Sequence, residues 1–512
     1  MGFYQREVIK YRSTLNVSRG PIVRSGVTSR LFPLYRPVSL LSIMVLCLVT
    51  LAVGCSSFGS HYQRVEKSLL AGHLEEADHI VEKTQEEYGQ RSRLLYLMDR
   101  GMTLHLAGHF QKSNEFLEQA DQLIEEFYTT RIRDEAAAIL LNETQLPYQG
   151  DPYEQVMVNV IKALNYTQLQ DLPAALVEAR RIDHRLNLLA DSVDDDAYHE
   201  DPFARYLTGL LYEATGDLNN AFIAYRKAEQ GYRQAESWSH VTIPSMLKED
   251  LLRTAKALGF DDELLRYQEE FPDMTPPVVN REQQAQIILV NLNGLGPRKS
   301  EALLDFPISL DALNLIALTK RGFGRSSPRT RGPDAVLYGL QGDIVRVALP
   351  QVLLQPSLVS YSEVRADNGV ESYQTQTQRV YDIQAVAKKN LDDDYTALVV
   401  RAVARAAMKM AAAVGIGYGA RAAVNKNSQA WVGLVAVILA RIFAIATEEA
   451  DIRTWRTLPG EIQVARLWVP PGTYSLVVHS FDARGQALPG GISEKISLLD
   501  GETKFLTQRI PE

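Results

Sequence analysis

Few residues in this chain are spaced in a way that could support chemistry, and the first candidates are metal ligands. His105 and His109 are four residues apart, which would place both on one face of a helix. Two histidines make a poor zinc site, and no glutamate lies next to His105 as in zinc proteases. The acidic run of residues 191–202 lacks the alternating ligands, central glycine and closing glutamate of a calcium loop. We therefore predict a helical turn and a solvated loop here, with no metal site.

Two further stretches could contact anions. GIGYGAR, residues 415–421, is rich in glycine, but it follows a predicted helix and lacks the lysine and hydroxyl pair of a phosphate loop. We interpret it as the break between two alanine-rich helices. The basic loop of residues 320–334 could contact an anionic glycan, a lipid head group or an acidic partner, and a solvated loop is the alternative. The side chains proposed for this anion contact are Arg321, Arg325, Arg329 and Arg331.

Cys55 has a clearer chemical role, because an export signal precedes it. The apolar run of residues 38–54 has 17 residues, short of the roughly 20 that span a bilayer as a helix. A stretch with seven basic residues and one acidic residue lies in front of it. A basic region, an apolar region and small residues before a break are typical of a signal peptide. A retained signal anchor is the alternative.

The residues LAVGC, which end at Cys55, resemble the lipobox of bacterial lipoproteins. The resemblance implies that residues 1–54 are a signal peptide and that residues 55–60 are a lipidated tether. It also implies sorting to the outer membrane, because Ser56 follows the cysteine where an aspartate would favour the inner membrane. Several acyl chains together would anchor the protein stably, and we expect it to face the periplasm.

Composition limits the remaining function classes. The chain has two cysteines, Cys47 and Cys55, so a lipidated mature protein has no thiol left for a disulfide, a zinc site or a nucleophile. The net charge is −8, and removal of a leader that carries +6 leaves −14. A charge of this sign argues against a nucleic-acid partner and against electrostatic docking on anionic lipid. At 512 residues, two or three domains are expected.

The stretch YLTGLLYEATGDLNNAFIAYRKAEQ, residues 206–230, predicts two helices joined by a turn at Gly216. It resembles the tetratricopeptide repeat (TPR), a helix–turn–helix unit of about 34 residues. Small residues would let the two helices approach, and tyrosines would fill the space beside them. The pattern recurs upstream, where Gly72 and Ala77 match a half-repeat, and Gly259 opens a last helix pair. The TPR-like residues are Gly101, Gly108 and Ala120 in one unit, and Gly209, Tyr212, Gly216, Ala221, Tyr225 and Ala228 in another.

We therefore predict a TPR-like helical array over residues 61–272. Such arrays bury their apolar faces by stacking, and they present a concave surface that binds peptides or proteins. The alternative is a generic antiparallel helical domain without a regular superhelix.

The pattern changes after a proline-rich linker at residues 273–284. Alternating apolar residues predict strands in a β-rich domain over residues 285–512, which resembles transthyretin-like or immunoglobulin-like sandwiches. A hairpin should turn at Asn368 and Gly369, and a closing hairpin at Asp500 and Gly501. The predicted fold class is α+β with several domains, in which the helical array precedes a β-sandwich-like domain.

We expect a helical insertion in the β-rich domain at about residues 392–450. Asp392 and the two following aspartates suit the start of a helix. The second helix is apolar from residue 430 to residue 446, apart from Arg441. A buried helical hairpin packed on the sheet fits this length, and membrane contact is the alternative.

The segment around residues 450–459 resembles an uncharacterised family of bacterial TPR-repeat-containing outer-membrane lipoproteins. The resemblance implies no activity and no binding residues. We expect the charged residues and the indole of this segment to lock the apolar helix onto the sandwich. The residues that carry the resemblance are Ala450, Asp451, Arg453, Trp455, Arg456, Leu458 and Pro459.

The expected function is that of an outer-membrane-anchored scaffold for protein–protein interaction in envelope assembly, secretion or wall synthesis. Its partners would be periplasmic or outer-membrane proteins, with no nucleic acid. The alternatives are an accessory subunit that uses the apolar hairpin in a membrane-associated complex, or a glycan-binding or glycan-processing protein. No catalytic motif supports an enzyme, and we predict no cofactor.

Overall fold

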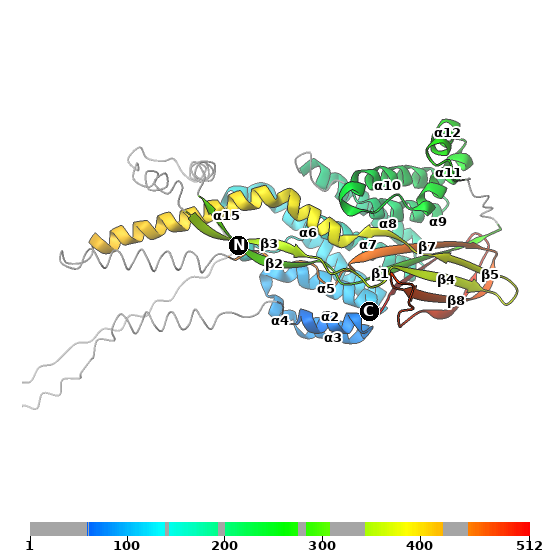
Figure 1. Cartoon of the computed structure of the whole chain (residues 1–512), viewed down its shortest axis with the longest axis horizontal. Coiled ribbons are helices and arrows are strands. Elements are labelled where there is room, and N and C mark those ends of the chain that lie inside the picture. The colour runs from blue at the N-terminus through cyan, green and yellow to red at the C-terminus, as the bar shows by residue number, and fades with distance from the viewer. Residues whose placement is uncertain are drawn as a thin grey trace, which may run out of the picture. The chain divides into compact units, whose positions relative to one another are not determined.

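The computed structural model divides the chain into two units, residues 1–57 and 58–512, and only the second is described. Cys55, the leader, the basic loop with its four arginines and the apolar run 430–446 lie outside the described residues. The described residues are 59, 61–138, 143–192, 200–274, 283–307, 344–422 and 449–512. Over these residues the protein contains both helices and sheets, with a helical N-terminal part and sheets later in the chain (Figure 1).

The helical part consists of antiparallel pairs. Helix α2 (Tyr62–Leu70) pairs with α3 (Leu74–Lys83), α5 (Arg93–Leu106) with α6 (Phe110–Ala138), α7 (Pro152–Gln168) with α8 (Leu172–Ser192), α9 (Pro202–Ala214) with α10 (Leu218–Ser239), and α11 (Ser245–Leu258) with α12 (Asp261–Glu270). Three short pieces complete it: α4 (Gln85–Tyr88), η1 (Gln90–Ser92) and η2 (Glu143–Gln145). Successive pairs stack through a shared hydrophobic core, as expected for a repeat array.

The turns within the pairs use a left-handed residue. Gly72, Gly108, Gly216 and Gly259 have φ angles of 73°, 81°, 85° and 70°, and Gln170 takes the equivalent place in the α7–α8 turn with a φ of 60°. Glycine adopts this conformation freely, whereas a side chain makes it costly. The turn at Gln170 is therefore built in the same way as the others, with a residue less suited to it.

The two best TPR-like units share one close contact between their helices. A Cβ atom on Gly101 would lie 2.4 Å from Leu117 Cδ2, and one on Gly209 would lie 2.3 Å from Tyr225 Cε1. Both distances are far inside van der Waals contact, so only glycine allows the second helix to pack this closely. The remaining TPR-like residues Ala120, Ala221 and Ala228 are fully buried, and Tyr212 is packed against the same core.

The β part consists of two four-stranded sheets and a two-stranded ribbon. Sheet A has the order β10-β1-β7-β6, sheet C has the order β5-β4-β8-β9, and the ribbon pairs β2 with β3. The strands are β1 (Ala285–Asn293), β2 (Arg298–Pro307), β3 (Ile344–Leu353), β4 (Tyr361–Asp367), β5 (Ser372–Gln376), β6 (Gln378–Asp382), β7 (Glu461–Val469), β8 (Gly472–Phe481), β9 (Ser493–Leu498) and β10 (Thr503–Arg509). The predicted hairpin at Asn368 and Gly369 is confirmed, since β4 and β5 pair antiparallel across it.

Sheets A and C face each other as a sandwich, and sheet A also faces the helices. On β1, Ala285, Ile287 and Leu289 belong to the core between the sheets. The alternate residues Ile288, Val290 and Leu292 belong to the core shared with the helical pairs. Because successive side chains of a strand point to opposite faces, β1 joins both cores and is buried along its whole length.

The predicted closing hairpin at Asp500 and Gly501 is wrong. Strand β9 pairs antiparallel with β8 in sheet C, whereas β10 pairs parallel with β1 in sheet A. The chain therefore crosses from one sheet to the other at this turn. The physical reason is burial on two sides: Phe505 of β10 packs in the core with the helices, while Leu506 packs in the sandwich.

The predicted start of the helical insertion at Asp392 is also wrong. Helix α15 (Ile383–Ala422) begins directly after β6, where Asp382 Oδ1 accepts a hydrogen bond of 2.9 Å from Ala385 N. Asp392 instead forms an ion pair with Lys388 one turn earlier in the helix. The segment 415–421 lies within α15 and does not break it.

Most of helix α15 packs on the ribbon (Figure 1), whereas its first turns, with Ile383, Val386 and Ala387, join the core shared by the helical pairs and sheet A. Leu398, Ala402 and Val403 of α15 share a small core with Val345 and Val347 of β3. Among the helices that the structure describes, none combines the length and the apolar character that a bilayer span requires.

We predict that Gly209→Ala destabilises the protein by about 1–3 kcal/mol, because the added methyl overlaps the ring of Tyr225. Without this overlap the substitution would stabilise the helix by about 1 kcal/mol. Urea unfolding followed by circular dichroism measures the difference. The double variant with Tyr225→Leu should lose less unfolding free energy than the sum of the losses of the two single variants. A more stable Gly209→Ala protein would contradict the close contact.

Candidate functional site

The first helices of the pairs present a row of carboxylates toward the β part, on a side that we call the inner face. Four of these carboxylates are buried and one is mostly buried. A buried charge is costly unless it is paired, so each of these side chains needs donors. Much of this need is met by residues 453–466, far along the chain. The carboxylates are Glu66 on α2, Asp99 on α5, Glu154 on α7, Glu213 on α9 and Asp250 on α11.

Residues 451–457, which we call the clasp segment, lie on this row. Trp455 is fully buried, and its backbone N–H donates to Glu154 Oε1 at 2.7 Å. Thr454 Oγ1 donates to the same oxygen at 2.9 Å. Thr457 Oγ1 accepts from the indole Nε1 at 3.0 Å and donates to Asp99 Oδ1 at 2.8 Å. The inner face thus holds an irregular peptide segment through its main chain and its side chains.

Two arginines fix the ends of the clasp segment. Arg453 donates to Asp451 at 2.8 Å and to the backbone oxygens of Glu143 at 2.9 Å and Leu146 at 3.1 Å. Arg456 donates from Nε to Glu66 Oε1 at 2.9 Å. The apolar helix lies outside the described residues, so the expectation that these residues lock it onto the sandwich stays a prediction. The two arginines lock the chain that leads into β7 onto the helical pairs, because the buried acceptors are there.

A second cluster follows on β7. Arg466 donates to Glu213 at 3.2 Å and contacts Asp250. Arg253 of α11 donates to both carboxylates at 2.7 Å. Burial would raise the pKa of Glu213, but the charges of Arg466 and Arg253 outweigh it and hold this pKa at about 2. Two arginines and two carboxylates therefore form a buried, charge-balanced set that joins α9 and α11 to sheet A.

The carboxylates under the clasp segment behave differently. Burial raises the pKa of Asp99 to about 6, although Tyr62, Tyr88 and Thr457 all donate hydrogen bonds to it. Burial likewise raises the pKa of Glu154 to about 7. Within the described part of the chain, no arginine donates a hydrogen bond to either carboxylate, so desolvation dominates.

Raised carboxylate pKa values occur in active sites, but this arrangement is not open to a substrate. Asp99 and Glu154 are completely buried, and their oxygens accept hydrogen bonds from the chain itself. Within the described ranges, no group of three or more His, Cys, Asp or Glu side chains could hold a metal ion. The row therefore serves to hold a peptide segment.

The two histidines considered as metal ligands do not meet. His105 is buried, and its Nδ1 lies 2.7 Å from Asn165 Oδ1. Burial lowers the pKa of His105 to about 4. His109 follows the turn glycine and lies 3.0 Å from the exposed carboxylate of Glu75. The HLAGH stretch is thus part of a repeat turn.

The row of carboxylates was not predicted from the sequence. Its signal is an acidic residue inside an apolar helical stretch, as in YLMDRGM around Asp99 and LLYEA around Glu213. Such a residue must be paired in the fold, but the partner lies hundreds of residues away and no spacing rule connects them. The four loop arginines and Cys55 lie outside the described residues, so their predicted roles stay predictions.

No family model matches the chain. No curated protein matches it either. Two solved structures, MamA MSR-1 C2 and MamA AMB-1 C2221, are similar over 42% of this chain and over 95% and 96% of their own chains. Their sequence identities are 13% and 12%, and both TM-scores are 0.25. At these values the similarity adds nothing to the description of the helical pairs given above.

We predict that Arg466→Ala destabilises the protein by about 3–5 kcal/mol, because it leaves two buried carboxylates with one arginine. Arg346→Ala is a matched control, because Arg346 forms an exposed ion pair with Asp305. The control should leave the unfolding midpoint unchanged. Denaturant unfolding of both variants at pH 7 measures the difference, and equal midpoints would contradict the role of Arg466.

We also predict a pH-dependent stability difference between the wild type and Asp99→Asn. The pKa of Asp99 rises from 3.8 to about 6 on folding, so the folded state holds the proton to higher pH than the unfolded chain. The contribution of Asp99 to stability is therefore present below about pH 4 and is lost as the pH rises to about 6. Over this window the wild type should lose on the order of 2 kcal/mol relative to Asp99→Asn. Parallel pH profiles of the unfolding free energy would refute the buried carboxylate's role.

Proposed function

We propose that this protein is a lipid-anchored scaffold of the bacterial cell envelope that binds other proteins through its helical pairs. The observation that carries the proposal is that Glu154 and Asp99 on the inner face accept hydrogen bonds from the clasp segment. Helical pairs that hold a peptide through buried acceptors have the chemistry of a protein-binding repeat. Anchoring at Cys55 and sorting to the outer membrane through Ser56 are part of the proposal.

The inner face is occupied by the chain itself, so partner proteins would contact other surfaces. The second helices of three pairs each expose a large apolar side chain: Val177 on α8 is 45% exposed, Ile223 on α10 is 45% exposed and Leu265 on α12 is 59% exposed. Such side chains lose contact with water in a protein interface, which supports these helices as the partner-binding surface. The partners would be periplasmic or outer-membrane proteins.

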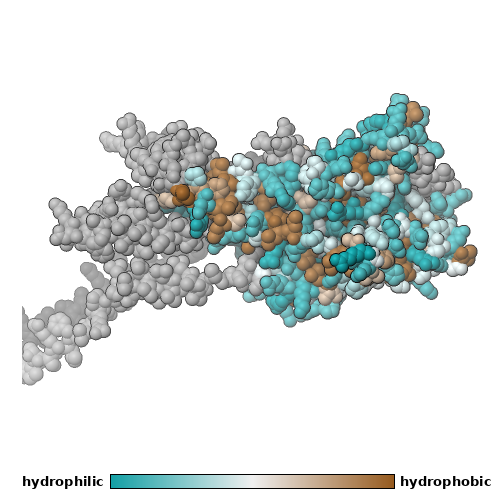
Figure 2. Space-filling model, viewed as in Figure 1, coloured by the Kyte–Doolittle hydropathy of each residue, from teal (hydrophilic) through white to brown (hydrophobic). Residues whose placement is uncertain are grey.

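A second candidate function is that of an accessory subunit in a membrane-associated complex. It is favoured by the ribbon, where Leu303 is 58% exposed and Ile344 is 70% exposed. Figure 2 shows hydrophobic side chains gathered over the ribbon and α15. In this case the ribbon, and not the second helices, would contact the partner.

Site-specific photo-crosslinking in cells tests the two functions. A photoreactive residue at position 223 of α10 should capture discrete envelope proteins from the outer-membrane fraction, and one at position 303 of the ribbon should not. The reverse result would favour the accessory subunit. A photoreactive residue at position 371, in the exposed turn after β4, is the control for chance contact.

The same cells test the anchor with the variant Cys55→Ala. If Cys55 carries the lipid, the variant should lose its outer-membrane fractionation while the purified protein keeps its circular dichroism spectrum. Unchanged fractionation of Cys55→Ala would contradict the anchor, and capture of no protein from any position would contradict the scaffold.

A further inference from the structure

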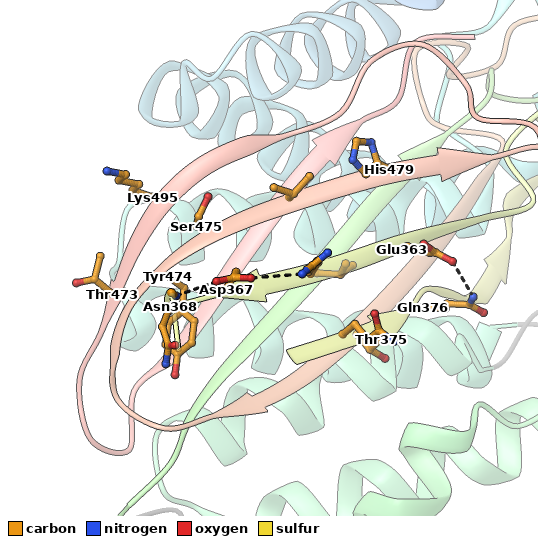
Figure 3. Close-up of a pocket in the computed structure, with 15 residues that line it drawn as sticks. Glu363, Asp367, Asn368, Thr375, Gln376, Thr473, Tyr474, Ser475, His479 and Lys495 are labelled. Atoms are coloured by element: carbon orange, nitrogen blue, oxygen red, sulfur yellow. Dashed lines mark hydrogen bonds and ion pairs between the residues drawn. The ribbon is translucent and has the colours of Figure 1, made fainter. Parts of the chain in front are cut away.

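The outer face of sheet C forms a hollow. None of its lining residues belongs to the row of carboxylates or to the clasp segment. The volume of the hollow is about 1060 Å³, close to the upper end of the size range of ligand sites. Figure 3 shows the labelled side chains around it, which come from all four strands of the sheet and from the β4–β5 turn. The lining residues whose side chains point outward and are exposed include Glu363, Gln374, Gln376, Ser475, His479 and Lys495.

Strand register places these side chains in rows across the sheet. Glu363 of β4 lies opposite His479 of β8 on one side and opposite Gln376 of β5 on the other. Directly opposed residues in a sheet are close neighbours with side chains on the same face. The hollow is therefore lined by planar amide, imidazole and carboxylate groups at regular spacing. Each of them can donate or accept hydrogen bonds.

The charges of the hollow are already balanced. Arg365 donates to Asp367 at 3.4 Å and to Ser372 Oγ at 2.8 Å. Gln376 Nε2 donates to Glu363 at 3.3 Å. Lys495 adds a positive charge that offsets the remaining carboxylate. A ligand with a strong net charge gains little from such a surface, whereas a polar uncharged ligand meets many donors and acceptors.

An aromatic pair continues the same face beyond Glu363 and His479. The rings of Tyr361 and Phe481, which oppose each other on β4 and β8, stack with centroids 5.2 Å apart and planes inclined at 17°. Both side chains are partly exposed. A sugar ring presents a face of C–H bonds, which suits the electron-rich face of an aromatic ring.

From these features we propose that the outer face of sheet C binds an uncharged oligosaccharide. Sugar rings stack on Tyr361 and Phe481, and sugar hydroxyls bond to the amide and carboxylate groups of the hollow. The four strands span roughly 14 Å from edge to edge, at about 4.8 Å between neighbours. This width accommodates several sugar rings in a chain that crosses the strands.

The face binds a glycan without cleaving it. Glu363 and Asp367 are four residues apart on β4, so their Cα atoms are about 13 Å apart. The two carboxylates have different partners, Gln376 for Glu363 and Arg365 for Asp367, and do not face each other across one bond as the carboxyl pair of a glycoside hydrolase does. The carboxylates of this hollow instead contribute acceptors for hydroxyl groups.

Titration calorimetry with the full chain tests this site. The probes are chitohexaose and cellohexaose as uncharged oligosaccharides and hexagalacturonate as an anionic one of equal length. We expect at least one uncharged probe to bind and hexagalacturonate to bind more weakly. Gln374→Ala should weaken the binding about fivefold, the loss of one hydrogen bond. Tyr361→Ala should weaken it about fivefold to tenfold.

Two controls separate recognition from folding. Tyr361→Phe keeps the ring and should bind within about twofold of the wild type. Arg346→Ala alters an exposed residue of the ribbon and should bind like the wild type. Unaltered binding by both Tyr361→Ala and Gln374→Ala would overturn the proposal. So would tighter binding of hexagalacturonate, or no binding of either uncharged probe.

The glycan site is independent of the proposed scaffold function. The sheet C variants leave the second helices and Cys55 untouched, so they test the site without changing partner capture. Loss of glycan binding with retained crosslinking at position 223 assigns the two activities to two surfaces. Crosslinking failure with retained glycan binding would contradict the scaffold alone.

Discussion

The cost of burying charge governs how the two halves of this protein fit together. The first helices place Asp99, Glu154, Glu213 and Asp250 in the interior, where an unpaired carboxylate is strongly destabilising. Many of their donors belong to the clasp segment and to β7, which come late in the chain. The helical pairs therefore depend on the β part to satisfy their inner face. In return, the clasp segment has no regular structure of its own and takes its conformation from the helices.

This dependence gives sheet A two roles. One face completes the sandwich with sheet C, and the other face closes the core of the helical pairs, with β1 contributing alternate residues to each. The helical pairs and the sandwich thus belong to one unit, and a face that could have bound a partner is part of the interior. Binding functions are left to surfaces that point away from this contact: the second helices, the ribbon and the outer face of sheet C.

Much of the fold could be predicted from the sequence where local rules apply. Turn glycines and close-packed glycines such as Gly209 marked the helix pairs, and alternation with the Asn368–Gly369 turn marked β4 and β5. Long-range choices were not predictable. The segment after β9 looked like a hairpin, yet β10 pairs with β1 because both of its faces are buried. The row of carboxylates could not be predicted for the same reason, since its hydrogen-bond donors lie far along the chain. The hollow on sheet C depends on cross-strand register, which no single strand reveals.

The parallel pairing of β10 with β1 has a consequence for how the chain reaches its final state. Helices α2–α12 are synthesised first, but their carboxylates meet the clasp segment and β7 only after more than half of the remaining residues have been made. Strand β10 and the Glu512 side chain follow β7 in the chain, and Glu512 accepts hydrogen bonds from Gly294 N at 2.8 Å and from Ser357 Oγ at 2.6 Å. Contacts of such sequence separation form slowly. The inner face therefore lacks the donors of the clasp segment and β7 until residues 454–466 have been made.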